Sequence, residues 1–432
     1  MIFIVAISIT LLSVVLLSTN LTTFLFAYAQ EDEFRQREFS DNGEPELLDR
    51  NLKIEEIASG LDTPTTMAFL GPNDILVLEK DKGTVKRILD GKVLDEPLLD
   101  VNVANSVERC MCGIAISKHD ATTYVFLYYT EIDGTDGEDR QGKQPIGNRL
   151  YRYELVDNRL VNPVILLDLP ALPGPRHNGG AIVIGPDDNL YVPIGDVDGS
   201  FRGEDFQTVT QNYHDGVDAD GRSGILRITQ DGQPVGEGIL GNEIPLRLYF
   251  AYGIRNSFGL GFDPVSGKLW DTENGPGNSD EINLVEPGFN SGWQEAMGIA
   301  KLEEEFDESE LVDFDGKGHY RDPELVWLNT AGPTAILFMA SDKLGMQYVN
   351  EMFVADVHNG RIYHFGLTED RMHLALPPAL EGKVIRSVNA EGVDQIIFGQ
   401  EFGGITDLKI GPDGYMYVVS VGLGKIFRIV PA

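Results

Sequence analysis

Residues 176–199 read RHNGGAIVIGPDDNLYVPIGDVDG. Two short apolar runs, 181–184 and 190–194, flank a Gly-Pro-Asp-Asp-Asn turn, a pattern typical of two β-strands joined by a tight turn. This hairpin places His177 before its first strand and Asp196 just after its second, on one rim of a sheet. A carboxylate beside an imidazole fixes the tautomer and supports the charged ring, as proton abstraction requires. On spacing alone, a turn histidine and a turn aspartate without chemistry is the favoured interpretation.

The same turn chemistry recurs from Leu52 onward. Gly-Pro-Asp and Asp-Gly turns separate short apolar runs, and each unit continues into a segment of alternating apolar and polar residues. Six such segments occur: GTVKRI at 83, NRLYRY at 148, GILRIT at 224, DEINLV at 280, GRIYHF at 360 and GKIFRI at 424. Their irregular spacing excludes WD40 and kelch arrays and favours an all-β six-bladed β-propeller with long inter-blade loops over a β-sandwich. Propellers bind ligands where loops of different blades meet, and His177 would lie on such a loop.

The N-terminal segment, residues 1–29, is apolar, contains no charged side chain and ends in Ala27-Tyr28-Ala29. It predicts a secretory signal peptide cleaved after Ala29. Because it has no Lys or Arg and is long enough to cross a bilayer, an uncleaved N-terminal membrane anchor stays open. Residues 30–51 are charged and poor in apolar side chains, which predicts a flexible acidic linker. The propeller is expected over residues 52–432, in a secreted or extracytoplasmic protein.

The charge balance restricts the partners. The formal net charge is -34 and the sequence pI is about 4.4. Nucleic acids and anionic membranes require basic surfaces, so neither is an expected partner. No glycine-rich nucleotide fingerprint follows a strand and opens a helix, which argues against a nicotinamide cofactor.

Cys110 and Cys112 are the two cysteines of the chain. A Cys-x-Cys disulfide is tightly constrained, and two thiols on one face of a strand form only part of a soft-metal site. We expect two packed free thiols, with a strained disulfide and a metal site as the open alternatives.

Two long stretches resemble a known family. The segments RHNGGAIVIGPDDNLYVPIGD, residues 176–196, and YGIRNSFGLGFDPVSGKLWDTENGPGNSDEINLVEPGFNSGW, residues 252–293, resemble the soluble glucose/sorbosone dehydrogenases. Members of this family are six-bladed propellers that oxidise aldose sugars with pyrroloquinoline quinone (PQQ) and calcium. The resemblance extends from about Ser59 to Val430. It implies a small-molecule sugar substrate and an external electron acceptor.

The resemblance assigns roles around the cofactor. His177 matches the catalytic base, which removes the proton of the anomeric hydroxyl while hydride passes to the quinone, and Asp196 matches the carboxylate that holds this histidine. Arg255 and Asn256 match the pair beside the quinone carbonyls, where a cation stabilises developing charge. Glu108 falls where relatives place a polar side chain against the cofactor.

The resemblance also assigns calcium ligands. Gly275 and Pro276 match the residues whose backbone carbonyls hold the cofactor-bridging ion, which can act as a Lewis acid on the quinone. Glu281 matches a ligand of a separate structural calcium, with the Ser291 carbonyl as its partner. His358 aligns near a position where relatives offer a basic residue to the cofactor.

The sequence departs from the family near its C-terminus. Gly404 and Thr406 stand where members carry two arginines, although Asp407 is kept. Because PQQ has three carboxylates, a site without those cations must neutralise it differently. The first hypothesis is an exported quinoprotein that oxidises the C1 hydroxyl of an aldose to a lactone. The alternatives are an extracellular propeller binding module that has lost PQQ, and a calcium-dependent lactone hydrolase.

Overall fold

A computed structural model describes residues 44–300 and 306–432 of the chain. The predicted signal or anchor segment and most of the predicted linker lie outside these residues. Within the described residues, no helix combines the length and the apolar character needed to cross a bilayer. The helical segments are short 3-10 turns: η1 Glu138–Gln141, η2 Gly199–Phe201, η3 Glu204–Phe206, η4 Val209–Gln211, η5 Leu246–Leu248, η7 Glu308–Glu310, η8 Met346–Tyr348, η9 Pro378–Leu380 and η10 Val393–Gln395.

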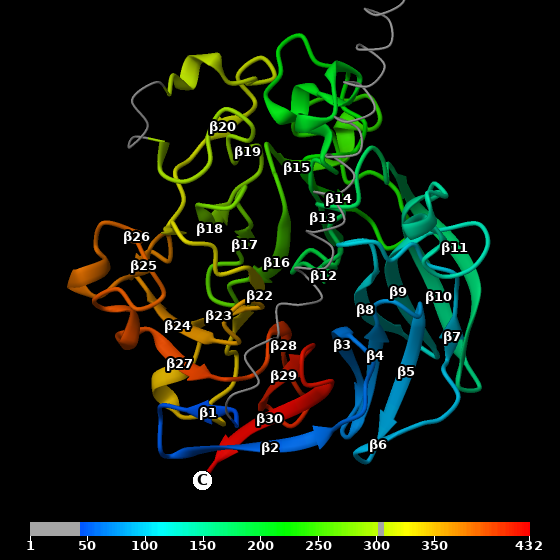
Figure 1. Ribbon diagram of the computed structural model, residues 1–432, viewed down its shortest axis with the longest axis vertical. Helices are drawn as coiled ribbons and strands as arrows, with labels where there is room; N and C mark the ends of the chain where they lie inside the picture. The colour runs from blue at the N-terminus through cyan, green and yellow to red at the C-terminus, as the bar shows by residue number, and fades with distance from the viewer. Residues whose placement is uncertain (1–43, 301–305) are drawn as a thin grey trace, which may run out of the picture. The chain divides into compact units, whose positions relative to one another are not determined.

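The described chain is all-β, as the turn pattern predicts, and its strands form six sheets (Figure 1). The first sheet contains β3 Pro64–Gly71, β4 Asp74–Glu79, β5 Thr84–Leu89, β6 Lys92–Val93 and β7 Leu99–Asp100. The second contains β8 Met111–His119, β9 Thr122–Glu131, β10 Gly147–Val156 and β11 Arg159–Leu169. The third contains β12 Val183–Ile184, β13 Leu190–Ile194, β14 Gly224–Ile228, β15 Tyr249–Tyr252, β19 Phe289–Asn290 and β20 His319–Tyr320.

In each of the other three sheets, the first three strands pair antiparallel in chain order. The fourth contains β16 Ser257–Phe262, β17 Leu269–Glu273, β18 Asp280–Val285, β21 Leu325–Trp327 and β26 Val384–Ile385. The fifth contains β22 Pro333–Phe338, β23 Met352–Asp356, β24 Ile362–Leu367, β25 Leu374–Ala375, β27 Ile397–Gln400 and β1 Glu46–Leu47. The sixth contains β28 Ile405–Ile410, β29 Met416–Ser420, β30 Lys425–Pro431 and β2 Leu52–Ala58.

The sheets are arranged like the blades of a propeller. Contacts between β3 and β8, β16 and β22, β22 and β28, and β28 and β3 bring the first strands of successive sheets together. Six buried apolar clusters in the described residues lie between neighbouring sheets and link all six in a cycle. One of them joins Val77 of the first sheet to Val419 and Ile426 of the last. The core is therefore divided among the sheet interfaces.

The Gly-Pro-Asp turns are built by a tyrosine that follows each of them. Tyr191 and Tyr417 donate hydrogen bonds from their hydroxyls to Asp187 and Asp413, at 3.0 Å and 2.9 Å. In both turns the tyrosine ring packs on the first glycine, where a Cβ atom would lie within 2.6 Å and 2.4 Å of a ring carbon. Glycine is therefore required by close approach, which explains why the same turn sequence recurs.

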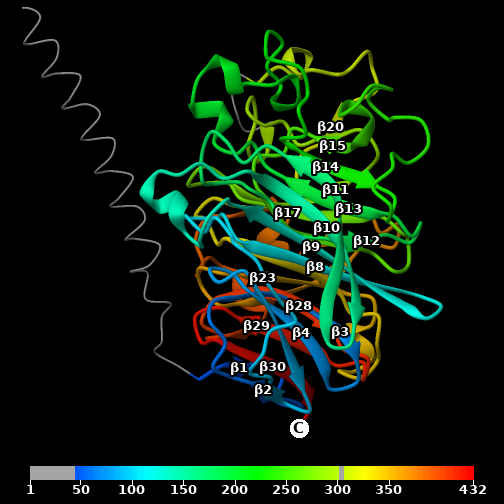
Figure 2. The same cartoon turned by 90° about the vertical axis from the view of Figure 1, so that its right-hand side faces the viewer.

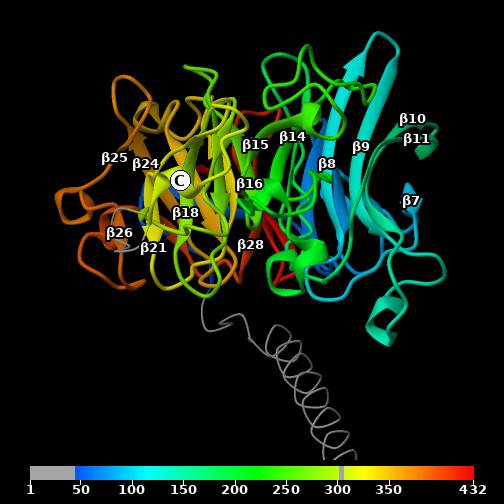
Figure 3. The same cartoon turned by 90° about the horizontal axis from the view of Figure 1, so that it is seen from above.

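The ring of sheets is closed by the two ends of the described chain. β2 pairs antiparallel with β30, and Figures 1 and 2 show the two strands side by side, blue against red. β1, which precedes β2, pairs with β27 in the fifth sheet. The end of the segment predicted as a flexible linker is thus part of the fold, because its backbone completes the hydrogen bonds of an edge strand. In Figure 3 the long strands β8–β10 lie side by side within the second sheet.

β30 closes the ring of sheets through a buried apolar cluster. Loss of a side chain from this cluster should therefore lower the free energy of unfolding strongly. Ile426→Ala removes a side chain with 0% exposure from the cluster between the first and last sheets. We expect a loss of about 2–5 kcal/mol in the free energy of unfolding, measured by urea denaturation. The neighbouring Lys425→Ala, which removes the partly exposed ion pair with Glu56 and a contact at 6.0 Å with the Phe427 ring, should cost less than about 1 kcal/mol. Equal losses in the two variants would contradict this role of the cluster.

Candidate active site

The predicted site residues lie at one end of the sheets. Glu108 precedes β8, His177 precedes β12, and Arg255 and Asn256 precede β16, while Asp196 follows β13. In an antiparallel pair, the start of one strand and the end of the next lie at the same edge. Loops from three successive sheets therefore meet at one end of the ring.

His177 and Asp196 are in direct contact. Nδ1 of His177 lies 2.5 Å from Oδ1 of Asp196, and both side chains are buried. The backbone supports this pair, because the Gly195 N–H donates to the His177 carbonyl at 3.1 Å. A Cβ atom on Gly195 would come within 2.1 Å of the Arg255 carbonyl oxygen, so only glycine fits here. The hairpin of the sequence prediction brings the imidazole and the carboxylate together.

Asp196 is held as a carboxylate. Its burial acts to raise the pKa, but hydrogen bonds and charge from His177, with further hydrogen bonds from Ser200 and Trp293, lower the pKa of Asp196 to about 2. The carboxylate is therefore ionised throughout the neutral range. It fixes the protonated ring nitrogen of His177 at Nδ1 and leaves Nε2 as the nitrogen for proton transfer.

The depressed pKa of Asp196 predicts a pH dependence of stability. The ionised group stabilises the fold above its unfolded pKa of 3.8, and this contribution is lost as the pH falls toward about 2. The contribution is on the order of 2 kcal/mol. Urea denaturation at several pH values from 5 to 2 should show a steeper loss for the wild type than for Asp196→Asn, which carries no titratable group there. Parallel curves would show that Asp196 is not held in this way.

Glu108 ties three loops together. Its carboxylate accepts the backbone N–H of His177 at 2.6 Å and the side-chain amide of Asn256 at 3.2 Å. Its own backbone N–H donates to the Pro175 carbonyl at 3.2 Å. Glu108 therefore positions the loop that carries His177 against the loop that carries Asn256.

Arg255 places a cation beside this pair. Its Nη1 donates to the Asn274 carbonyl at 2.5 Å, and its backbone N–H donates to Glu273 at 2.5 Å. Burial lowers the pKa of Arg255, and the charges of Asp196 and Glu108 act to raise it. Nε of Arg255 and Oδ1 of Asn256 are buried without a partner among the described residues. These two unpartnered atoms fit a polar ligand bound at this end of the ring.

The residues assigned to the cofactor-bridging calcium lie on the turn between β17 and β18. Asp280 orders this turn, because its Oδ1 accepts the Gly275 N–H at 2.9 Å while its Oδ2 accepts the Ala331 and Gly332 N–H groups at 2.8 Å. Gly275 is partly buried, and Pro276, the next residue in the turn, is exposed. Backbone carbonyls on an ordered turn have the chemistry that calcium prefers.

Glu281 belongs to a buried row of carboxylates. Asp271, Glu273 and Glu281 are all within 1% of full burial, and both oxygens of Asp271 lack a partner in the described part of the chain. Burial raises the pKa of each of the three. The negative charge of Glu273 raises the pKa values of Asp271 and Glu281 further. The Ser291 hydroxyl donates to Glu273 at 2.6 Å. These oxygen donors suit a hard cation, yet across residues 44–300 and 306–432 no three acidic, His or Cys side chains are placed to hold a metal.

His358 lies outside the bonded network. Its exposed ring contacts the Thr330 carbonyl at 3.4 Å, and its backbone N–H donates to the Ala331 carbonyl. Its charge acts on Asp280, the residue that orders the Gly275 turn. The hydroxyl of Thr406, at one of the two positions without arginine, donates to the Pro64 carbonyl at 3.1 Å.

Comparison with known proteins decides the family. The sequence profile of the glucose/sorbosone dehydrogenases matches residues 61–428. This chain belongs to that family. The aldose sugar dehydrogenase YliI of Escherichia coli is 25% identical over 88% of this chain and 93% of its own length.

Solved structures agree on the fold of this dehydrogenase family. A crystal structure of an oxidoreductase (glucose dehydrogenase) from Thermus thermophilus shares 25% identity, with a TM-score of 0.66 over 88% of this chain and all of the other. The PQQ-bound aldose sugar dehydrogenase of Streptomyces coelicolor shares 23% identity, with a TM-score of 0.62 over 90% and 99% of the two chains.

The two cysteines form a disulfide, so the expectation of free thiols is wrong. A β-bulge between Met111 and Gly113 shortens the chain locally, and the Cα atoms of Cys110 and Cys112 lie 5.3 Å apart. This distance is within the range that a disulfide spans. A Cβ atom on Gly180 would come within 2.4 Å of the Cys112 Cβ, so the disulfide packs against the loop that carries His177.

The disulfide predicts that the native protein has no reactive thiol. Denatured, unreduced protein should give no thiol signal with an aromatic disulfide reagent, and reduction should release two thiols per chain. The Cys110→Ser and Cys112→Ser variants should each give one. Two thiols in the unreduced wild type would contradict the bond.

Sequence reasoning missed Trp293. Its indole N–H lies 3.0 Å from both Asp196 Oδ2 and Ser200 Oγ, so it contacts the carboxylate that holds His177. One signal in the sequence could have identified it: Trp293 is the last residue of the second stretch that resembles the family. Its contact with Asp196 is made across 97 residues of sequence, which no local pattern reveals.

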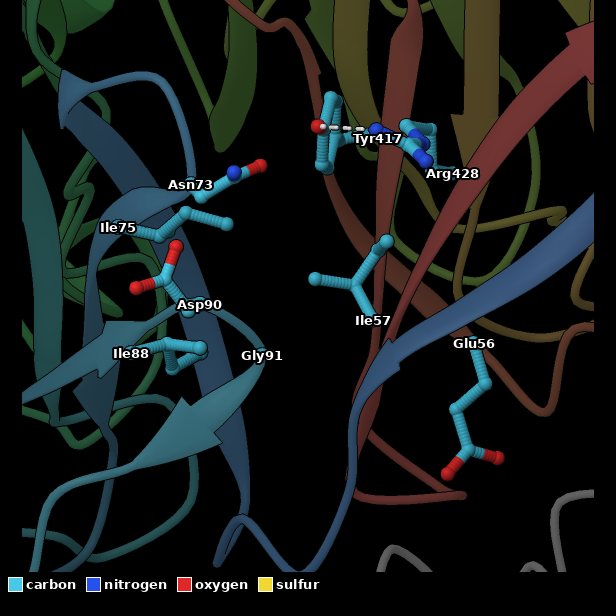
Figure 4. Close-up of a pocket in the computed structure, with 9 residues that line it drawn as sticks. All are labelled: Glu56, Ile57, Asn73, Ile75, Ile88, Asp90, Gly91, Tyr417 and Arg428. Atoms are coloured by element: carbon cyan, nitrogen blue, oxygen red, sulfur yellow. Dashed lines mark hydrogen bonds between the residues drawn. The ribbon is translucent and has the colours of Figure 1, made fainter.

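A cavity of about 290 Å³ lies elsewhere, between the first and last sheets (Figure 4). It contains none of the predicted site residues, and its wall includes the residues at the start of β4. Arg428 in its wall is already paired with Glu55 and Asp413. The cavity therefore offers no free arginine for a ligand.

Proposed function

We propose that this member of the glucose/sorbosone dehydrogenases is an exported quinoprotein that oxidises the C1 hydroxyl of an aldose to a lactone. It uses PQQ and calcium and passes electrons to an external acceptor. Its six sheets are the six blades of a propeller, with the site at one mouth of the ring. The uncharged segment 1–29 and the disulfide support export, because disulfides persist in oxidising compartments.

The contact between His177 and Asp196 carries this proposal. Nε2 of His177 takes the proton of the C1 hydroxyl, and the Asp196 carboxylate stabilises the imidazolium that forms. Burial of both side chains excludes water and strengthens this interaction. Proton removal raises the electron density at C1, so that a hydride can leave the carbon.

The residues present fit PQQ at the quinone end of the site. Arg255 would hold it through its unpartnered Nε–H, which can donate to a quinone oxygen, whereas Oδ1 of Asn256 would accept from a donor of the ligand. When bound, PQQ accepts the hydride from C1. Arg255 supplies positive charge where negative charge develops, and Glu108 keeps Asn256 aligned with the histidine loop. The cofactor class is supported by one solved neighbour, which is a PQQ-bound aldose sugar dehydrogenase.

Calcium has two proposed places. The carbonyls of Gly275 and Pro276 would hold the ion beside the cofactor, and Glu281 with the Ser291 carbonyl would hold a structural ion. A bound cation would stabilise the buried carboxylates around Glu281. Among the described residues, hydrogen bonds and the charge of Arg255 are what stabilises their ionised forms.

The decisive experiment is a titration of the calcium-loaded apoprotein with PQQ, followed by absorbance and by dye reduction with a panel of aldoses. His177→Ala should lower kcat by roughly 10²- to 10⁴-fold while PQQ binding is kept, because only the proton acceptor is removed. His119→Ala is the matched control, since this exposed histidine lies at the end of β8 far from Glu108. Wild-type rates in His177→Ala would refute the assignment.

The second candidate function is an extracellular binding module without PQQ. It is favoured by Gly404 and Thr406, which leave two expected cations out of the site, with the Thr406 hydroxyl already bonded to Pro64. Absence of PQQ binding at micromolar concentration, with calcium bound and the fold intact, would support this alternative over the dehydrogenase.

A further inference from the structure

Trp293 links the two halves of the site. Its indole N–H donates to Asp196 Oδ2 at 3.0 Å, and the guanidinium carbon of Arg255 lies 5.3 Å from the centre of its ring. We propose that Trp293 is a positioning residue that holds the carboxylate behind His177 and the Arg255 cation in one fixed arrangement. This inference rests on the proposed function, because the proton and the cofactor of that reaction define the role.

The two oxygens of Asp196 have different partners. Oδ1 faces His177 Nδ1 at 2.5 Å and accepts the Asp198 N–H at 3.0 Å. Oδ2 accepts the indole N–H of Trp293, and the Ser200 hydroxyl, 3.0 Å from the same indole nitrogen, also hydrogen-bonds to the carboxylate. The carboxylate torsion of aspartate is intrinsically broad, so bonds at one oxygen alone leave its plane free to turn. The indole, together with Ser200, therefore fixes the plane of the carboxylate, and with it the direction in which His177 Nε2 points.

The face of the same indole holds the cation. A guanidinium over a tryptophan ring is attracted by the negative face of the π-system, most strongly where water is excluded. Arg255 is 8% exposed and its Nη1 is fixed by the Asn274 carbonyl. These two contacts leave the unpartnered Nε available to a bound ligand. A shift of the ring would thus move Arg255 and Asp196 together.

Buried amides anchor the backbone of Trp293. Its N–H donates to the Gly253 carbonyl at 3.0 Å, and its carbonyl accepts Nδ2 of Asn212 at 2.8 Å. Asn212 and Asn290 exchange side-chain hydrogen bonds at 3.1 Å and 2.8 Å. A satisfied buried network of this kind is rigid. The loop after β19 is therefore built to present the indole at a fixed place.

The test is Trp293→Phe, which removes the N–H donor and keeps an aromatic face. We expect kcat to fall roughly 10- to 100-fold, the cost of one hydrogen bond to a charged group. The KM for sugar and the affinity for PQQ should change by no more than about twofold, since the ring under Arg255 is kept. The acid limb of the pH profile should move to higher pH, because the Asp196 carboxylate loses one of the hydrogen-bond donors that lower its pKa.

The other charged groups that set this profile stay in place. Glu108 bonds to the backbone of His177, Arg255 places its charge beside Asp196, and Arg176 pairs with Asp198 at 3.8 Å. The shift of the acid limb therefore reports the Trp293 contact.

Trp270→Phe is the matched control. Trp270 has 0% exposure on β17, and its indole N–H has no partner among the described residues. Its replacement should leave kcat and the pH profile unchanged. Wild-type kcat and pH profile in Trp293→Phe would overturn the inference. Equal losses in the two variants would overturn it as well, because they would reflect packing in general.

A double-mutant cycle separates this inference from the proposed function. The effects of Trp293→Phe and Asp196→Asn on the free energy of unfolding should be non-additive, whether or not PQQ is bound. Additive effects would overturn the positioning contact even if the wild type oxidises sugars. A non-additive cycle in a wild type that oxidises no sugar would refute the proposed function and leave the contact with Asp196 standing.

Discussion

The structure depends on the pairing of β2 with β30. This pairing puts the first long strand and the last strand of the described chain in one sheet, so that the cycle of sheets has no open end. Without β2, β30 would expose a row of backbone donors and acceptors along one edge. The cluster that contains Ile426 would lose its cover there. Each sheet buries its apolar faces against its neighbours, so every interface depends on this closure. The loops at the ends of the sheets are free to carry function because the closed ring holds their bases.

The antiparallel order of the strands brings the site residues to one end of the sheets. Glu108, His177 and Arg255 each stand just before the first strand of a sheet, and Asp196 and Asn274 stand just after a second strand. Residues separated by more than a hundred positions meet at one end without any dedicated connection between them. The hydrogen bonds of Glu108 to the His177 backbone and to Asn256 show how closely three sheets converge there.

The sequence predicted those features of the structure that depend on residues close together in the chain. The repeated turns indicated the all-β fold, because glycine under a tyrosine ring and the following aspartate form the turn wherever they occur. The contact of His177 with Asp196 followed from one hairpin. Contacts between distant segments could not be predicted: the disulfide depends on a β-bulge, β1 pairs with β27 from the far end of the chain, and Trp293 contacts Asp196 across 97 residues of sequence. The proposed roles of Gly275 and Pro276 in calcium binding rest on family resemblance, since backbone carbonyls leave no pattern in side chains.

The charge around Arg255 gives the proposed cofactor chemistry its main constraint. Burial lowers the pKa of Arg255, and the charges of Asp196, Glu108 and Glu273 act against this shift. The same carboxylates repel an incoming ligand with three carboxylates, and Thr406 offers it no positive charge. The single positive charge of Arg255 cannot neutralise the three carboxylates of PQQ in addition to the carboxylates of the protein. Under the proposed function, a calcium ion at the Gly275 turn must therefore supply charge as well as Lewis acidity, and PQQ affinity should depend on calcium more steeply than in relatives that carry both arginines.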